Sequence, residues 1–362
     1  MAKQIVVITG ASGFLGSAVC LDLIKDFTVL AIDRREPSEK LRMLSPKVIW
    51  HILDIADARK TSDLFVKIKS EFGGIDFLIH FAAYYDFDDE WVGEYQRTNV
   101  TGTANLIKAS IYSGIKRFIF ASSVAAMEPP AIGASLNEDS PTSETTPYMR
   151  SKSLGEELLV DASPRLKTSI MRIAGVFSDW CELPPLYSLI KLWTAPYPYG
   201  CLIPGRGETG IPYIHMNDFV PLIRKIIHKH HALSPLDIFL ASPHGAVLHR
   251  DLFPAIRSAA GYSGTHKPIH IPRKIAKFGL HFQRAMGKFS GNMPFERPWM
   301  LEYVDRPWTI NSEKTRQILE WDCTPELGIL EKIHVIMKRR KDDLNWWEER
   351  NISRISSLSQ MD

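Results

Sequence analysis

A tyrosine, a lysine and a serine pair are the residues of this chain whose types and spacing could carry out chemistry. Tyr148 and Lys152 are four positions apart, so on a helix their side chains would lie on one face, about one turn apart. A free phenol, with a pKa of about 10, is a poor base at neutral pH, but a nearby ammonium group stabilises the phenolate and lowers that pKa. Ser123, which follows Ser122 and stands 25 positions before Tyr148, could bind a substrate oxygen and share its developing charge. This set predicts proton transfer to and from a substrate oxygen.

A glycine-rich segment near the N-terminus could bind a dinucleotide. Residues 9–16 read Thr-Gly-Ala-Ser-Gly-Phe-Leu-Gly and stand between an apolar run and a helical pattern, which is the context of a βαβ cofactor site. Gly10 would permit a tight turn, Gly13 would let the backbone approach a pyrophosphate, and Gly16 would allow close packing of helix and sheet. The free N–H groups at the start of the helix would face the phosphates. We therefore expect cofactor contacts from Gly10, Ser12, Gly13, Phe14, Leu15 and Gly16.

Two acidic residues, one at the end of the second expected strand and one just after the third, could contact the adenosine end of such a cofactor. Asp33 stands 17 positions after Gly16, where a carboxylate accepts hydrogen bonds from the ribose hydroxyls and repels a 2′-phosphate. This favours NAD over NADP, although Arg34 and Arg35 could instead pair with that phosphate and leave NADP open. Asp54 could contact the adenine amino group, or it could be an ordinary acidic residue ahead of a helix.

The first half of the chain alternates strand-like and helix-like segments, which must position these residues. We expect strands at 4–9, 28–33, 48–53, 77–81, 117–121 and 168–172, each short and apolar as parallel strands buried on both faces are. Helical patterns occupy 14–25, 57–72 and 99–113, with Asp57 and Gly114 as expected ends, and another continues from about 148. This alternation predicts an α/β fold, a Rossmann-type doubly wound parallel sheet with helices on both faces.

The character of the sequence changes after about residue 176. Residues 180–205 hold five large aromatic residues, five prolines and two cysteines, which indicates a loop-rich cap over one end of the sheet. We expect an NAD(P)-binding Rossmann domain over 1–176. A smaller, loop-rich substrate lobe would occupy mainly 177–345, with segments that return to the first domain. The final thirty residues would form a charged helical segment and then a serine-rich tail that frays, and we assign 346–362 to the tail.

The overall composition excludes several other classes of protein. The 362 residues carry 44 basic and 41 acidic side chains, and a net charge of +3 gives no basis for a general nucleic-acid binder. The four cysteines are far apart, so we expect no metal site, and reduced thiols in the cytoplasm. Glycines interrupt the apolar residues 4–24, and no uninterrupted apolar stretch is long enough to cross a membrane.

Together these motifs resemble those of the extended short-chain dehydrogenases/reductases, the NAD-dependent epimerase/dehydratase family. The resemblance covers most of residues 4–330. It rests on the glycine turn, the serine pair and the Tyr148–Lys152 pair. Three further motifs support it: His80-Phe81-Ala82-Ala83, Asn99-Val100-x-Gly102-Thr103 and His215-x-x-Asp218.

The resemblance implies a role for each of these residues. Tyr148 would be the acid/base, Lys152 would lower its pKa and hold the nicotinamide ribose, and Ser123 would orient the reacting oxygen. The cofactor would be NAD or NADP. Beside it the resemblance places Ile55, Phe81, Ala82, Ala83, Asn99, Ser122 and Ile173. His215 would be structural, at the point where the second lobe rejoins the first.

Departures from the family patterns bear on the reaction. Sugar-nucleotide dehydratases place an acidic pair after the catalytic hydroxyl, whereas Val124 and Ala125 follow Ser123 here and cannot move a proton. Many sugar-nucleotide epimerases place an Arg where this chain has Ile211 and an Asn where it has Gly175. Both departures weaken the sugar-nucleotide interpretation.

Residues 172–177 look more like an element of the 3β-hydroxysteroid dehydrogenase and dihydroflavonol reductase branches, although Ile173 replaces the usual Pro. With an apolar cap, this predicts an NAD(P)-dependent oxidoreductase that interconverts a secondary alcohol and a ketone on a small, apolar or ring-containing substrate. The alternative is an NAD-dependent sugar-nucleotide epimerase, for which Arg206 could still reach a phosphate. A second alternative is a regulator that binds NAD(P) without catalysis, which the complete Ser, Tyr and Lys set disfavours.

Residues 266–300 concentrate positive charge within the nearly neutral chain. Seven basic residues against one acidic residue give this segment a net charge of +6, with apolar residues interleaved. A basic amphipathic helix could lie on an anionic membrane surface, but a solvated face packed on the smaller lobe is the commoner case and the one we expect. The remaining expected partners are the small-molecule substrate and, as is frequent in the resembled family, a second copy in a homodimer. No nucleic-acid partner is expected.

Overall fold

Seven parallel strands form the central sheet of the computed structural model, which describes residues 3–87, 89–131, 133–262, 264, 266–290 and 294–356, with the backbone alone at 288–290 and 353–356. Their order across the sheet is β11-β6-β5-β4-β1-β2-β3, and every neighbouring pair is parallel. The strands are β1 Ile5–Thr9, β2 Thr28–Asp33, β3 Ile49–Ile52, β4 Phe77–His80, β5 Arg117–Ser123, β6 Thr168–Ile173 and β11 Leu236–Ala241. The predicted Rossmann-type α/β class is confirmed.

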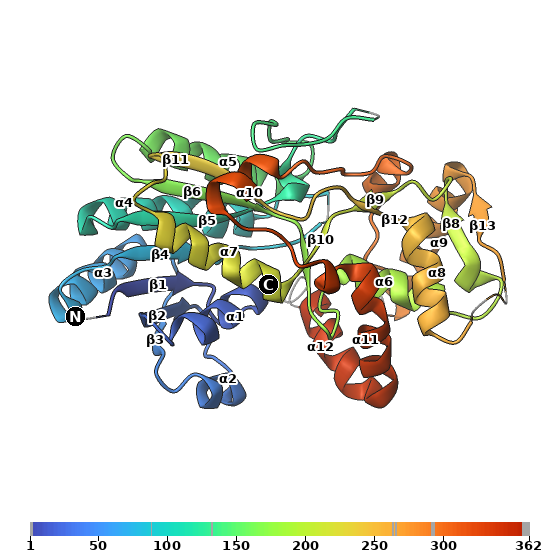
Figure 1. The fold of residues 1–362 in the computed structure, drawn as a ribbon, viewed down its shortest axis with the longest axis horizontal. Coiled ribbons are helices and arrows are strands. Elements are labelled where there is room, and N and C mark those ends of the chain that lie inside the picture. Colours follow the sequence, from blue (N-terminus) through green and yellow to red (C-terminus); the bar gives the residue numbers. More distant parts are fainter. Residues whose placement is uncertain are drawn as a thin grey trace.

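Helices cover both faces of this sheet, because alternate residues of each buried strand point to opposite faces. In β1, Val6 and Ile8 join one core with α1 (Phe14–Leu23) and α7 (Met216–Lys229). Ile5 and Val7 join the other core, to which α3 (Ala58–Phe72), α4 (Thr103–Ser113) and α5 (Pro147–Ala162) contribute. The short α2 (Glu39–Leu44) follows β2 and buries no residue. Figure 1 shows the two helical layers on either side of the strands.

The elements of the first half agree with the sequence pattern, for identifiable reasons. Asp57 is the N-cap of α3, since its carboxylate accepts a hydrogen bond of 3.0 Å from the amide of Lys60. Gly114 ends α4 in the left-handed region, with φ of 67°. The helix predicted from 99 begins earlier, because a π-helical segment, η1 (Tyr95–Gly102), precedes α4. The seventh strand, β11, was not predicted and extends the sheet beside β6.

The second part of the chain is mostly helical and not the loop-rich lobe that the sequence suggested. Pro184 and Pro185, counted among the features of a loop-rich cap, instead stand at the first positions of α6, where the N–H that proline lacks would have no helical partner. Three two-stranded pairs complete this part: β7 Gly175–Phe177 with β10 Tyr213–His215, β8 Leu202–Pro204 with β13 Ile269–Ile271, and β9 Gly210–Ile211 with β12 Val247–Leu248. Its helices are α6 Pro184–Trp193, α8 His249–Ala259, α9 Arg273–Ser290, α11 Ile329–Asp342 and α12 Leu344–Ser356, and the short α10 Glu313–Leu319 lies near β11.

The tail predicted over 346–362 is instead helical up to Ser356, and the last six residues lie outside the described part of the chain. Trp347 of α12 is fully buried and its ring lies 5.2 Å from the ring of Tyr187. An ion pair of 2.6 Å between Arg350 and Glu182 fastens the same helix. The sequence indicated a charged and serine-rich segment here, but it did not indicate that one tryptophan would anchor α12 to the rest of the protein. No helix among the described residues is long and apolar enough to cross a membrane.

Replacement of Trp347 by alanine should lower the free energy of unfolding by about 3–5 kcal/mol, because it removes a large buried ring and leaves a cavity. The neighbouring Trp346 is only half-buried, so Trp346→Ala should cost less than about 1.5 kcal/mol. Urea denaturation of the two variants measures the difference. Equal, small losses would contradict the anchoring role of α12.

Candidate active site

Tyr148 and Lys152 lie at the start of α5, where local sequence fixes the helix. Thr146 is the N-cap and its hydroxyl accepts a hydrogen bond of 3.3 Å from the amide of Met149, while Pro147 takes the first helical position. Both candidate catalytic side chains are buried, with 5% of Tyr148 and 7% of Lys152 exposed. The Lys152 ammonium donates a hydrogen bond of 2.8 Å to the carbonyl oxygen of Ala121. The predicted one-turn spacing is therefore present, on a helix that faces β5.

The serine pair ends β5, beside this helix. The Ser123 hydroxyl accepts a hydrogen bond of 3.1 Å from the amide of Ala125, and it also stabilises the ionised form of the Tyr148 phenol. Ser122 points the other way and donates a hydrogen bond of 2.5 Å to the carboxylate of Glu156. The two serines thus differ in their hydrogen bonds: Ser123 accepts one from the backbone of Ala125, and Ser122 donates one to the carboxylate of α5.

The pKa of Tyr148 differs from the sequence-based expectation. Burial raises it to about 12, although the nearby Ser123 side chain lowers it. Burial also lowers the pKa of Lys152 to about 8, against the negative charge of Glu156. The predicted lowering of the phenol pKa is therefore not seen among the groups of the chain itself, because desolvation of the phenolate outweighs its stabilisation. Below its raised pKa the phenol holds its proton, which suits donation to a carbonyl oxygen.

A buried ion pair lies one turn beyond Lys152. Glu156 and Arg172, both less than one-tenth exposed, approach to 2.8 Å between Oε2 and Nη2, and the Arg172 Nε adds a hydrogen bond of 3.1 Å to Oε1. Arg172 also donates to the carbonyl oxygens of Glu138 and Ser140. These contacts join α5, the end of β6 and the 138–140 loop. Neither residue of the pair was assigned this role from the sequence.

A cavity of about 1660 Å³ connects the glycine turn with Tyr148 and with the second part of the chain. Of the residues proposed as catalytic or cofactor-binding, those that line it are Gly10, Ser12, Gly13, Phe14, Leu15, Gly16, Asp33, Arg34, Asp54, Ile55, Phe81, Ala82, Ala83, Ser122, Ser123, Tyr148, Lys152 and Ile173. Asn99 does not line it. Its amide is buried and pairs with both backbone groups of Tyr84 and with the hydroxyl of Ser151, so it holds the loop after β4 against α5.

The glycine turn fits the phosphates of a dinucleotide. Gly10 has φ of 67°, and a Cβ at this position would lie 2.6 Å from the backbone nitrogen of Ala82. Only glycine therefore lets the segment after β1 pass the segment after β4, which is the topological switch point of the sheet. The Ser12 hydroxyl is buried and has no hydrogen-bond partner among the described residues. A phosphate oxygen above the turn would satisfy it.

The motif that begins at His80 stabilises the glycine turn through a chain of hydrogen bonds. His80 is buried, its Nδ1 lies 2.7 Å from the Thr9 hydroxyl and its Nε2 lies 3.0 Å from the Thr103 hydroxyl. The Thr9 hydroxyl in turn accepts from the amide of Ala82 at 3.3 Å. Burial lowers the pKa of His80 to about 3, so the ring is neutral at physiological pH. It is a structural link between the ends of β1 and β4 and the start of α4.

Asp33 lies at the end of β2, as its proposed ribose contact requires. One carboxylate oxygen accepts a hydrogen bond of 2.9 Å from the amide of Ser12, and the other accepts one of 3.1 Å from the amide of Arg35. These bonds fix the carboxylate against the glycine turn and leave its outer lone pairs directed to the cavity that it lines. The position fits a ribose diol.

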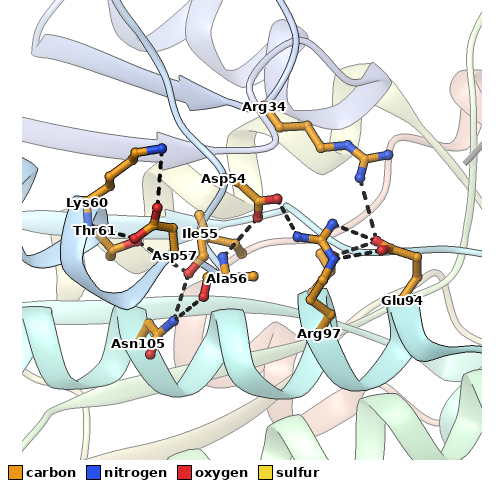
Figure 2. Close-up of polar contacts among 11 residues, drawn as sticks. Arg34, Asp54, Ile55, Ala56, Asp57, Lys60, Thr61, Glu94, Arg97 and Asn105 are labelled. Atoms are coloured by element: carbon orange, nitrogen blue, oxygen red, sulfur yellow. Dashed lines mark hydrogen bonds and ion pairs between the residues drawn. The ribbon is translucent and has the colours of Figure 1, made fainter.

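Asp54 belongs to an ionic network that the sequence did not indicate (Figure 2). It pairs with Arg97 and accepts a hydrogen bond of 3.0 Å from the amide of Ala56. Arg97 also pairs with Glu94 at 2.7 Å, and Glu94 lies 3.5 Å from Arg34. Burial raises the pKa of Asp54, but the hydrogen bonds from Ala56 and Arg97 lower it more, so the pKa lies below its usual value. Asp57 caps the helix that follows, and Asp54 links the end of β3 to η1.

Aromatic side chains that the sequence analysis did not single out surround the phenol of Tyr148. Tyr85 and Phe87 lie 5.1 and 5.3 Å from its ring, and both line the cavity. The indole of Trp299, in η4 (Pro298–Tyr303), donates a hydrogen bond of 3.0 Å to the carbonyl oxygen of Phe87. Tyr85 and Phe87 come soon after the fourth strand, where site residues gather, and this position was the clue that the sequence offered.

His215 is structural, in line with the interpretation from the sequence. Its Nδ1 accepts a hydrogen bond of 3.2 Å from Asn217 and so caps α7, and its Nε2 lies 3.3 Å from a carboxylate oxygen of Asp179. The carboxylate of Asp218 accepts two hydrogen bonds from Thr324, at 2.8 and 3.1 Å. The element therefore ties the end of β10 to the C-terminal helices.

The half of the cavity beyond Tyr148 is mainly apolar. Its lining comes largely from α6, α9 and residues 295–308. Ile211 lines it where sugar-nucleotide epimerases have Arg. At Gly175, a Cβ would lie 2.9 Å from Leu183, so a larger side chain would collide. Arg206 is 75% exposed, pairs with Glu208 and does not line the cavity, so the proposed phosphate contact is not supported.

Comparison with known proteins identifies relatives of this site and fold. The model of the NAD dependent epimerase/dehydratase family matches residues 6–240. The dTDP-D-glucose 4,6-dehydratase of Mus musculus is 30% identical over 248 residues, which span 63% of this chain and just under two thirds, 65%, of the mouse protein. The 3β-hydroxysteroid dehydrogenase branch is not specifically supported by these matches.

Solved structures share the fold at low identity. The UDP-glucose 4-epimerase of Thermotoga maritima with UDP-glucose has a TM-score of 0.70 at 18% identity, with 94% of this chain and 100% of that chain covered. The dTDP-glucose 4,6-dehydratase of Bacillus anthracis in complex with NAD also has a TM-score of 0.70, at 16% identity, with 96% and 99% covered. The observed architecture is therefore one that NAD-bound enzymes adopt.

Replacement of Glu156 by glutamine should lower the free energy of unfolding by about 3–5 kcal/mol, because it leaves the buried guanidinium of Arg172 without a counter-charge. The double variant Glu156→Gln/Arg172→Met removes both charges and should recover a large part of that loss. Chemical denaturation of wild type, single and double variants measures this. A single variant as stable as wild type would contradict the proposed anchoring of α5.

Proposed function

We propose that this chain, which belongs to the NAD-dependent epimerase/dehydratase family, interconverts a secondary alcohol and a ketone, with Tyr148 as the acid/base. The observation that carries the proposal is the position of Ser123, Tyr148 and Lys152 in one cavity with the glycine turn. Regulators without catalysis would not need this complete set. The catalytic assignment rests on geometry and on the family resemblance.

In this proposal Ser123 and Tyr148 have different roles at one substrate oxygen. Ser123 donates a hydrogen bond to that oxygen and orients it, and Tyr148 removes or returns its proton. Bound NAD would accept the hydride from the alcohol carbon and return it in the reverse direction. Lys152 would hold the nicotinamide ribose, and its ammonium would favour the phenolate when Tyr148 gives up its proton. The apolar surroundings of the phenol exclude water from this exchange.

NAD is the proposed cofactor, in preference to NADP. The carboxylate of Asp33, held in place by two backbone amides, would accept hydrogen bonds from the adenosine ribose and repel a 2′-phosphate. Arg34 is drawn toward Glu94, at 3.5 Å, and so is partly neutralised as a phosphate partner. Both features favour NAD.

Dehydration is disfavoured as the net reaction. Dehydration needs a second proton-transfer group near the catalytic hydroxyl, but Val124 and Ala125 follow Ser123, and both line the cavity. The mainly apolar lining of the substrate half supports a substrate with an apolar or ring-containing body. We therefore place an alcohol–ketone oxidoreductase first.

A sugar-nucleotide 4-epimerase is the second candidate, and the names of the relatives favour it. Such an enzyme oxidises and re-reduces one carbon with the same three residues, so the site chemistry permits it. Arg306 supports it as an exposed cation of the cavity lining that has no ion-pair partner among the described residues. Ile211 and Gly175, in place of the expected diphosphate and sugar contacts, weigh against it.

Tyr148→Phe should lower kcat by roughly 10²–10⁴-fold and leave the Kd for NAD nearly unchanged, because it removes only the proton-transfer hydroxyl. Tyr95→Phe is the matched control, a buried tyrosine of the same aromatic cluster that does not line the cavity. Assays would use steroid-like, lipid-ketone and UDP-sugar substrates, with NADH supplied for ketones and NAD for alcohols and sugars. Net consumption of NADH with a ketone, or net formation with an alcohol, marks an oxidoreductase, and isomerised product without a net change in NADH marks an epimerase. Full activity of Tyr148→Phe would refute the mechanism.

Asp33→Ser should shift the ratio of Kd values from NAD toward NADP by roughly ten-fold, because the carboxylate that repels a 2′-phosphate is lost while Arg34 and Arg35 remain. Calorimetric titration with each cofactor measures this ratio. Glu36→Ser is the control, since Glu36 also lines the cavity but pairs with Arg42. An unchanged ratio in Asp33→Ser would contradict the assignment of the ribose contact.

A further inference from the structure

Helix α9 (Arg273–Ser290) carries an apolar stripe that the described part of the chain leaves uncovered. Its members recur every three or four positions and are 59%, 74%, 64% and 53% exposed: Ile275, Phe278, Phe282 and Met286. The neighbouring face of the same helix is packed, with Leu280 8% exposed and η4 alongside. Large apolar side chains gathered at helical spacing on a surface mark an interaction site. The segment is thus packed on one side, as expected, but its solvated face carries large apolar residues as well as charge.

Positive charge flanks this stripe. Lys274 and Lys277 on α9, and Lys267 just before β13, are exposed and have no hydrogen-bond or ion-pair partner among the described residues. The helix contains no acidic residue. Arg273 pairs with Glu302 at 3.7 Å, so the free lysines supply most of the field on this side. A partner for this surface must therefore combine apolar groups with negative charge.

The stripe is continuous with the main cavity. Ile275, Phe282 and Met286 are at once exposed on α9 and part of the cavity lining that includes Tyr148. Helix α9 lies with α8, β8 and β13 at the end of the molecule opposite the N-terminus (Figure 1). The partner would thus bind beside the substrate half of the cavity, away from the glycine turn.

We propose that α9 docks the protein on an anionic lipid bilayer, with the apolar stripe in the boundary between head groups and acyl chains. Lys267, Lys274 and Lys277 would then lie at the level of the lipid phosphates. A second copy of this chain fits the surface less well, because a symmetric contact would place these lysines opposite one another. An anionic bilayer supplies both the apolar layer and the negative charge that the surface requires.

Docking in this way would bring the cavity mouth to the bilayer surface. An apolar or ring-containing alcohol dissolved in the bilayer could then enter past Phe282 and Met286. This consequence, unlike the docking itself, rests on the proposed function. Docking is tested without turnover, so that the two can fail separately.

The test is co-sedimentation of the full chain with phosphatidylcholine vesicles, with and without phosphatidylserine. Wild type should bind the anionic vesicles, and added salt should weaken the binding. Phe278→Ser, at a residue outside the cavity lining, should weaken it about ten-fold. Lys274→Gln/Lys277→Gln should weaken it by roughly 25-fold at low salt, about five-fold per lysine. Met43→Ser, at a similarly exposed side chain of α2, is the control and should bind as wild type does.

Three results would overturn the proposal. The first is a wild type that does not sediment with anionic vesicles, and the second is equal binding to neutral and anionic vesicles. The third is a dimer, seen by light scattering in the absence of vesicles, that Phe278→Ser dissociates, since this would assign the stripe to a second copy. Unchanged Kd for NAD in every variant shows that the variants are folded, because α9 lies away from the glycine turn.

Discussion

The buried ion pair between Glu156 and Arg172 is the interaction on which the geometry of the site depends. It lies one helical turn beyond Lys152 and joins α5 to the end of β6, while Ser122 attaches the end of β5 to the same carboxylate. A buried pair remains favourable only if its other polar atoms are also satisfied, and Arg172 achieves this with two carbonyl groups of a loop. Helix, strands and loop are thereby held at one spacing, which places Tyr148 and Ser123 on the wall of the same cavity.

A second constraint acts at the opposite end of the same cavity. Between β1 and β4 the order of the sheet reverses, and the backbone at Gly10 passes so close to Ala82 that no side chain fits between them. One cavity is lined both by this glycine turn and by Ser123, Tyr148 and Lys152, so the proposed cofactor and the proposed acid/base would meet in one space.

Local rules explain which parts of the sequence could be interpreted correctly. Gly10, Asp57 and Tyr148 each sit at an element boundary, where a cap, a turn or a helical spacing decides the outcome from a few residues. Trp347 and Arg172 act through partners far away in sequence. No local pattern could therefore reveal that Trp347 anchors α12 or that Arg172 anchors α5. The proline-rich residues 180–205 suggested loops, but α6 begins at Pro184, because the first turn of a helix accepts the prolines that its interior does not.

The protein combines the glycine turn of its family with a substrate half whose lining is mainly apolar. We propose that hydride and proton transfer occur at one carbon–oxygen bond of the substrate, with Tyr148 as the acid/base. A crystal structure of the protein with NAD and a ketone analogue tests this most directly. We expect the nicotinamide ring beside Lys152 and the ketone oxygen within hydrogen-bonding distance of both Ser123 and Tyr148. A nicotinamide ring outside the cavity, or a ketone oxygen bound away from these two hydroxyls, would contradict it.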